Sequence, residues 1–555
     1  MKIFQILILS CIVLLGACDP GQPTGTIEFQ AVGYAQPLTQ KEFNSLSPEQ
    51  QYQVANKLLG TMFRGVSAED FFNLDAGTST LQLKASSSTF LSDTHRLLTT
   101  PVGTQRILAI DSAIDGLDDE GNPTLDPKYV FDTTTDVRRN NRARQLPLAR
   151  IKEYPISREF FNHWMAYFLA NTILFSPAEE METTDFGDVQ SMYRFLVTQL
   201  DAGNTVRGIV RANLPSLARW RVSRSPENHA LEAYELYLGL FDTAEDSFRG
   251  GIACKDFYLT PENQGYLIRQ TSYPNTTPQL VLDSYYITTC DDLYDVIAGH
   301  PLLIPRVTEV IVNYLLAGRS LDDRLHMVES ITSSGAETFE DIFLAILFSK
   351  EYLLNTERPK SYEENLMSLL DTLEWSPIAS QYPVDERIFI NMASNSGSRM
   401  HLDGMGWSSM SYKIGRLPDV PLDGLSFANY HKSLREDFLM RKDSYKGGGT
   451  LNTGEHVGGL FYDENQIAKT DIAALSINDF IDFLFLNTLQ RKASKVERDD
   501  LVALITARGH TTTDPDRGDI IREDRYDDVA AITFDYISRL PELYYFRAIG
   551  QGAGS

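Results

Sequence analysis

The chain has 555 residues, and 43% of them are hydrophobic, so it has enough apolar side chains for a sizeable core in two or more packed units. Its 75 acidic residues outnumber its 50 basic ones and give a formal net charge of -25. This acidity argues against a nucleic-acid-binding protein, because phosphate binding depends on clustered Lys and Arg. It equally disfavours electrostatic attachment to anionic lipid heads.

Residues 1–17 have the layout of a secretory signal peptide. Lys2 gives a positive start, the run Ile3–Leu15 is almost wholly apolar, and small residues precede Cys18. The run is too short for a stable membrane span. The Leu-Gly-Ala-Cys sequence is typical of a bacterial lipoprotein signal, so we expect Cys18 to carry diacylglycerol and a fatty acid such as palmitate. The alternative is an ordinary signal peptide that contains a cysteine.

Residues 18–40 are predicted to be a lipidated tether, because Asp19–Thr26 is rich in Pro and Gly. We therefore expect a protein on the periplasmic side of a bacterial cell envelope, held at the membrane by its acyl anchor. Asp19 resembles the signal that retains enteric lipoproteins in the inner membrane, but this sorting rule varies between bacterial groups. The choice between inner and outer membrane stays open.

Five Ser-Pro or Thr-Pro pairs predict helix starts, because in each a capping hydroxyl precedes proline at the first helical position. These pairs begin at Ser47, Ser176, Ser225, Thr260 and Ser376. Strand-like runs are few and short, at 26–30, 106–110 and 387–390. The sequence therefore predicts a mainly α, multi-helical globular protein with a few short strands.

Composition divides the rest of the chain into four regions. They are an N-terminal helical region with an acidic loop at 41–150, a helical core at 151–442, a Gly-rich linker at 443–465 and a C-terminal helical subdomain at 466–555.

A faint internal repeat lies on either side of the linker. Val310–Leu325 can be aligned with Phe480–Leu501, since each pairs an apolar helix with a basic turn and an acidic second helix start. Downstream, Ile346–Leu353 parallels Ile537–Tyr544. Such a two-helix unit needs a neighbour against which to bury its apolar face. Chance similarity between amphipathic helices is the alternative.

Two of the four cysteines are left for a structural disulfide. Cys11 is lost with the signal peptide and Cys18 is consumed by lipid, whereas Cys254 and Cys290 remain as an even pair in an oxidising compartment. They flank a loop-rich segment that buries little apolar surface for its length. Removing the bridge is expected to lower stability by about 2 to 4 kcal/mol. The alternative is two buried free thiols.

Asp111–Asp126 is a dense acidic loop whose carboxylates are candidates for binding calcium. The candidate ligands are Asp115, Asp118, Asp119 and Asp126. Their spacing misses that of an EF-hand loop, so a solvated acidic turn is the competing interpretation. No other cofactor is predicted.

The helix that starts at Ser225-Pro226 carries His229, Glu232 and Glu235 at three-residue spacing. This spacing spreads them over about a third of the helix circumference. Two carboxylates and an imidazole suit a metal site or acid–base catalysis. The same groups also form salt-bridge clusters between helices, and three arginines lie just upstream. These are Arg219, Arg221 and Arg224.

Residues Pro226–Gly239 (PENHALEAYELYLG) resemble the N-E-N-x-A-R-E-x-x-E-L-H-x-L-G signature of the bacterial domain of unknown function 1800 family. Weaker motifs occur in the family's order over about residues 155–440, at Phe161–Trp164, Thr243–Asp246, His300-Pro301, Phe348–Tyr352 and Gly406-Trp407. The resemblance implies a mainly helical, often exported protein of a largely uncharacterised family. Because the family's arginine is Leu231 here and its histidine after Glu-Leu is Tyr237, the resemblance implies structural roles first for Asn228, Glu232 and Glu235.

Two functions compete. The chain lacks the G-x-S-x-G and H-E-x-x-H motifs, so we expect a non-catalytic protein that binds or scaffolds an envelope protein or polysaccharide. The alternative is an envelope hydrolase that cleaves a glycan or peptide with Glu232 and Glu235. The four tryptophans suit sugar stacking but suit a helical core better; they are Trp164, Trp220, Trp375 and Trp407.

Overall fold

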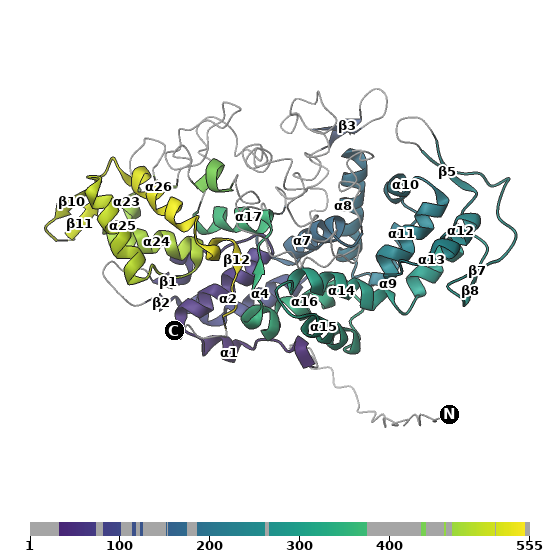
Figure 1. Cartoon of the computed structure of the whole chain (residues 1–555), viewed down its shortest axis with the longest axis horizontal. Helices are drawn as coiled ribbons and strands as arrows, with labels where there is room; N and C mark the ends of the chain where they lie inside the picture. Colours follow the sequence, from purple (N-terminus) through teal and green to yellow (C-terminus); the bar gives the residue numbers. More distant parts are fainter. Residues whose placement is uncertain are drawn as a thin grey trace. The chain divides into compact units, whose positions relative to one another are not determined.

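Helices account for most of the computed structural model (Figure 1), and the predicted mainly α class is confirmed. The residues it describes are 33–73, 81–101, 114–117, 123–125, 151, 154–174, 186–260, 266–374, 434–439, 460–461, 469–516 and 518–549. All of them belong to one compact unit, Ala31–Ser555. No helix within these ranges is long and apolar enough to cross a membrane. The predicted signal peptide, Cys18 and nearly all of the predicted linker fall outside them.

The N-terminal region is built around one central helix, α2. Its helices are α1 (Gln40–Asn44), α2 (Pro48–Thr61), α3 (Ala68–Phe71) and α4 (Phe90–Thr99), with 3-10 turns η1 (Gly33–Ala35) and η2 (Ala85–Thr89). Two short antiparallel strand pairs accompany them, β1 (Phe72–Asn73) with β2 (Gln82–Leu83) and β3 (Ile114–Leu117) with β4 (Pro123–Leu125). Most of α2 is buried, and the Trp164 indole donates to the Thr61 carbonyl at 3.0 Å.

The middle of the chain is a run of helices interrupted by two hairpins. The helices are α7 (Arg158–Asn171), α8 (Phe186–Asp201), α9 (Val206–Asn213), α10 (Leu217–Ser223), α11 (Pro226–Leu238), α12 (Ala244–Ala253) and α13 (Cys290–Gly299). The hairpins lie between α12 and α13 and comprise β5 (Phe257–Leu259), β6 (Leu267–Arg269), β7 (Gln279–Val281) and β8 (Tyr285–Ile287).

Two of the five predicted helix starts are confirmed and one is wrong. Ser47 caps α2 and Ser225 caps α11, each with proline at the first helical position. Thr260 instead extends a hairpin, because its N–H donates to the Tyr266 carbonyl next to β5 and β6. Pairing between these strands overrides the local helix signal. The other two pairs, at Ser176 and Ser376, lie outside the described residues, as do the three strand-like runs.

Two helix pairs reproduce the internal repeat. The first pair is α14 (Leu303–Leu315) with α15 (Leu321–Ser333), and the second is α24 (Ile477–Leu489) with α25 (Lys495–Ala507). All four helix ends of the second pair lie 174 residues after those of the first. A third helix follows each pair, α16 (Phe339–Leu347) or α26 (Tyr526–Ile537). We refer to α14–α16 as copy 1 and to α24–α26 as copy 2 (Figure 1).

Equivalent positions of the two copies share their local roles, which supports a true repeat over chance similarity. Each second helix begins at a capping serine, buries two apolar residues and is followed by a glycine with positive φ. The equivalent residues are Ser320 and Ser494, Met327 and Leu501, Ile331 and Ile505, and Gly335 and Gly509. Copy 2 also has a hairpin before its third helix, formed by β10 (Thr511–Asp514) and β11 (Gly518–Ile521).

A pair of strands joins the ends of the two copies. β9 (Arg358–Pro359) follows copy 1, and β12 (Tyr545–Phe546) follows copy 2; the two pair antiparallel. Arg358 lies in this seam and donates two hydrogen bonds, of 2.6 and 2.9 Å, to the Glu364 carboxylate. Both side chains are buried, so each charge depends on the other. The remaining elements are η4 (Glu351–Asn355), α17 (Tyr362–Thr372), η5 (Leu434–Leu439), α23 (Thr470–Ala473) and η6 (Pro541–Leu543).

Candidate functional site

His229, the first of the sequence-predicted site residues, is a buried core histidine. It lies one turn after the Ser225 cap of α11, and its side chain is fully shielded from solvent. The imidazole stacks on Trp220 with ring centroids 4.2 Å apart, and its Nδ1 lies 3.2 Å from the Ser223 hydroxyl. Burial first, and then the positive charge of Arg219, hold the pKa of His229 well below its ordinary value. The ring is therefore neutral at physiological pH.

Glu232 balances a buried arginine. The Arg219 guanidinium is inaccessible to solvent and lies 2.6 Å from the Glu232 carboxylate. Asn228 donates to the other carboxylate oxygen at 2.8 Å. A buried guanidinium without a counter-charge is strongly destabilising. His229 and Glu232 thus form the structural cluster that the sequence offered as the alternative to catalysis.

Glu235 is half-buried, as is Glu232. Burial and the nearby Glu232 carboxylate both raise the pKa of Glu235. Within the described ranges, no three or more His, Cys, Asp or Glu side chains are placed to hold a metal ion together.

The calcium candidates fall mostly beyond the described structure. Asp115 lies in strand β3, which pairs with β4 around a register shift. Asp118, Asp119 and Asp126 lie outside the described residues. Calcium binding by this loop stays a prediction.

Cys254 and Cys290 lie at disulfide-bonding distance, as the sequence predicts. Their sulfur atoms are 2.02 Å apart and their Cα atoms 4.4 Å apart. Cys254 follows the last residue of α12 and Cys290 is the first residue of α13, so the bridge joins the two ends of the hairpin segment. Both sulfurs are buried. The cross-link limits the conformational freedom of the segment between the two cysteines, chiefly in the unfolded chain.

The inner faces of the hairpins pack on the helices. Phe257 of β5 stacks on Trp220 at 5.4 Å, and the Arg269 guanidinium of β6 lies over the Phe257 ring at 5.0 Å. Arg249 of α12 donates to the Leu280 carbonyl of β7 at 2.8 Å. These contacts fix which side of each hairpin faces solvent.

The outer faces of the hairpins carry tyrosines. Tyr258 lies opposite Ile268 in the β5–β6 register, so both side chains point to the same face, and Tyr266 follows on that face two residues before Ile268. Tyr266 is 66% exposed. In the second hairpin, Tyr286 lies opposite Leu280 and is 73% exposed. Each hairpin therefore presents an aromatic side chain to solvent.

This surface was not predicted from the sequence. The aromatic residues were expected in the helical core, where Trp164 and Trp220 are indeed completely buried. The available signal was the density of aromatic residues between the two cysteines, with Tyr258 and Tyr266 eight positions apart on either side of Thr260-Pro261. Reading that signal required a hairpin, whereas Thr260-Pro261 suggested a helix.

Comparison with protein-family models, with curated proteins and with solved structures gave no match to this chain. The resemblance to the domain of unknown function 1800 family therefore stays a prediction.

Proposed function

We propose that this protein is a bacterial lipoprotein that binds an envelope polysaccharide through the exposed aromatic side chains around its disulfide-linked hairpins. One observation carries the proposal. Among the described residues, seven aromatic side chains are classed as exposed, and six of them lie between residues 241 and 286. These six are Phe241, Phe248, Tyr258, Tyr266, Tyr273 and Tyr286.

Exposed tyrosines suit a sugar polymer. An aromatic ring offers a flat apolar face to the C–H groups of a sugar, and the tyrosine hydroxyl adds a hydrogen-bonding group at the edge. A soluble monomer rarely gathers exposed apolar side chains without a binding role. The disulfide between Cys254 and Cys290 limits the ordering that binding would otherwise require. A preorganised surface of this kind suits repeated, weak contacts along a polymer.

The cellular part of the proposal rests on the N-terminal sequence. Cys18 would anchor the chain through diacylglycerol and a fatty acid, and two or more acyl chains make such attachment stable. The predicted tether ends too late at residue 40, because Gly33–Leu38 contacts α15 and the end of α16. The part of it before Gly33 would leave the helical body free to reach a polymer in the envelope.

Binding is tested with named polymers. We expect the purified mature chain to co-sediment with at least one of peptidoglycan sacculi, chitin or cellulose, and the Tyr266→Ala variant to lose most of that binding. Tyr266→Phe should keep it, because the ring stacks without its hydroxyl. Val496→Ala changes a 69% exposed apolar residue outside the hairpins and serves as the matched control. Equal loss in Tyr266→Ala and Val496→Ala would contradict the proposal.

The anchor is tested separately. Expressed in a bacterial host with an alkyne-labelled palmitate, the wild-type chain should incorporate the label and partition with membranes. Cys18→Ser should do neither. Fractionating an Asp19→Ser variant then decides which membrane is the target; an unchanged distribution means that Asp19 carries no sorting information.

An envelope hydrolase is the second candidate, and the half-buried Glu235 with its raised pKa is the feature that favours it. A raised pKa is what a general acid requires near neutral pH. Turnover of sacculi by the wild type, abolished in Glu235→Gln with unchanged folding, would replace the binding proposal with this one.

A further inference from the structure

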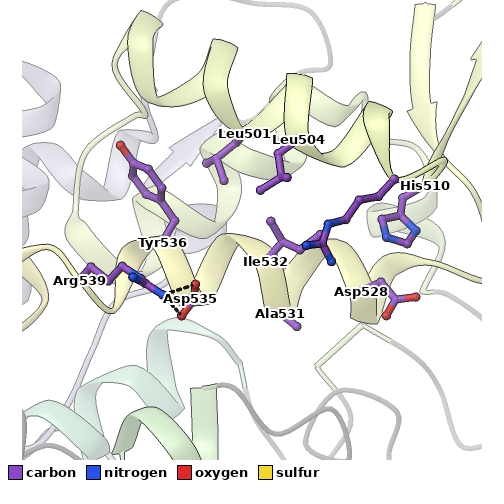
Figure 2. A pocket seen from close by; sticks show the side chains of 10 residues that line it. Leu501, Leu504, His510, Asp528, Ala531, Ile532, Asp535, Tyr536 and Arg539 are labelled. Carbon is purple, nitrogen blue, oxygen red and sulfur yellow. Dashed lines mark hydrogen bonds and ion pairs between the residues drawn. The ribbon is translucent and has the colours of Figure 1, made fainter.

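Copy 2 contains an open groove between α25 and α26 (Figure 2). Its volume is about 540 Å³, within the range of small-ligand and peptide sites. Apolar side chains from both helices line it; they are Leu501, Leu504, Ala531 and Ile532. Charged and polar side chains complete the lining; they are Arg508, His510, Asp528, Asp535, Tyr536 and Arg539.

In copy 1, the chain itself covers the corresponding helices. The segment Gly33–Leu38, which we call the N-terminal strap, runs across α15 to the end of α16. The Tyr34 ring stacks on His326 of α15 with ring centroids 5.1 Å apart, and the Tyr34 backbone N–H donates to the Ser330 hydroxyl at 3.0 Å. Further along, the Leu38 N–H donates to the Phe348 carbonyl at 2.8 Å. A short chain segment that begins as the 3-10 turn η1 therefore fits this face of the repeat.

The groove of copy 2 corresponds in position to the place that the strap occupies in copy 1. The offset of 174 residues between the helix pairs makes Leu504 the equivalent of Ser330, the strap's partner on α15. Aligning Ile346 with Ile537 makes Arg539 the equivalent of Phe348, the strap's partner beyond α16. Both equivalents line the groove. Copy 2 thus has a groove at positions equivalent to those that the strap contacts in copy 1, and no described segment covers it.

The charges in the groove indicate what would fill it. Asp535 is paired with Arg539, as the dashed lines in Figure 2 show, and Asp528 is paired with Arg525 at 3.1 Å. Within the described residues, the Arg508 guanidinium makes no hydrogen bond or ion pair. His510, beside it, has a buried Nδ1 without a hydrogen-bond partner. An acidic group on the ligand would complement this end of the groove.

We propose that the groove between α25 and α26 binds a short segment of a partner polypeptide, with an apolar side chain on Leu504 and a carboxylate at Arg508. By analogy with the strap, the segment runs from α25 towards the end of α26. Arg508 lies one turn beyond Leu504 on α25. A segment that runs towards the end of α26 passes Arg508 before Leu504, so its acidic residue precedes its apolar one. This site is separate from the hairpin surface.

The probe is a fluorescein-labelled peptide with the sequence of residues 27–38 (IEFQAVGYAQPL), which contains the strap and Glu28. We expect saturable one-to-one binding to the mature chain by fluorescence polarisation. Leu504→Glu should weaken it at least tenfold. Arg508→Glu should weaken it severalfold and should restore binding of a peptide carrying Glu28→Lys. This charge exchange distinguishes a specific contact from loss of folding.

The matched control is Leu325→Glu, which places the same charge on an exposed position of α15 in copy 1. It should leave the affinity unchanged. Absence of binding, or equal binding by the wild type and Leu504→Glu, overturns the proposal. A wild-type dimer that Leu504→Glu converts to a monomer in light scattering would assign the groove to a second copy of this chain and overturn the partner assignment.

Discussion

The helices of the α14–α15 and α24–α25 pairs have equal lengths, and so do the turns that connect them. The second helices of the two pairs are nevertheless buried to different degrees. α15 buries four residues, two of them polar, whereas α25 buries only Leu501 and Ile505. The N-terminal strap accounts for part of the difference, because it contacts Ser330. The same helix pair can therefore be covered in one copy and border an open groove in the other, depending on what packs against it.

The turns inside the two pairs also differ in how closely other chain segments approach. In copy 1 the chain before β9 passes Gly318, and a Cβ atom there would lie 1.5 Å from the Glu357 carbonyl oxygen. In copy 2 the equivalent position is Lys492. Copy 1 therefore requires glycine at this turn, whereas copy 2 accepts a long side chain.

The largest expected effect comes from breaking the seam that joins the copies. Arg358→Ala leaves Glu364 as a buried, unpaired charge, so the free energy of unfolding should fall by about 3 to 5 kcal/mol. Urea denaturation measures it. Arg539→Ala removes an exposed pair in copy 2 and should change the stability by less than about 0.5 kcal/mol. Similar losses in the two variants would mean that the buried Arg358–Glu364 pair contributes no more to the free energy of unfolding than the exposed Arg539–Asp535 pair.

Gly318→Ala tests the difference between the turns. The new methyl group must displace a backbone carbonyl, so the expected loss is about 3 kcal/mol. Lys492→Ala, at the equivalent turn of copy 2, should cost less than about 1 kcal/mol. Thermal unfolding of the two variants gives the comparison directly, and a tolerated Gly318→Ala would contradict the close approach.

Two equivalent buried asparagines test how far the copies differ inside. The Asn487 side chain accepts a hydrogen bond from the Ala68 N–H at 2.7 Å, so Asn487→Ala leaves a buried donor unpaired and should cost about 2 kcal/mol. Asn313, its equivalent, makes no side-chain hydrogen bond within the described residues, and Asn313→Ala should cost clearly less. Equal losses of stability in the two variants would contradict the idea that only Asn487 makes a stabilising side-chain hydrogen bond.

The last expected effect is a change in the pH dependence of stability, with the smallest magnitude per pH unit. Burial is the main cause that lowers the pKa of Lys360 to about 8, and its ammonium donates to the Leu543 carbonyl across the seam. Between about pH 8 and pH 10, Lys360 is deprotonated in the folded chain but still protonated in the unfolded chain. The free energy of unfolding should therefore rise with pH, by about 1 kcal/mol per pH unit. Urea unfolding of the wild type and Lys360→Met at several pH values should show this slope only in the wild type. Equal slopes would mean that Lys360 does not titrate in this range.

Much of the fold could be predicted from local signals. The caps at Ser47 and Ser225, the repeat and the pairing of Cys254 with Cys290 all follow from residues close in sequence or from compartment chemistry. The helix start predicted at Thr260-Pro261 was wrong, because pairing between β5 and β6 outweighed the capping signal. The roles of charged residues were harder to predict, because they depend on neighbours that sequence spacing does not identify.

Local sequence signals establish the mainly helical class and the starts of α2 and α11, because capping and hydrophobic periodicity act within a few residues. The even number of cysteines left after the signal peptide and Cys18 predicts the Cys254–Cys290 pair. Only the tertiary structure decided that His229 is buried, that Glu232 balances Arg219 and that the hairpin tyrosines face solvent. It also decided that copy 1 is covered by the strap while copy 2 keeps a groove. Burial and partnership depend on which distant segments meet, and packing of the whole chain sets that.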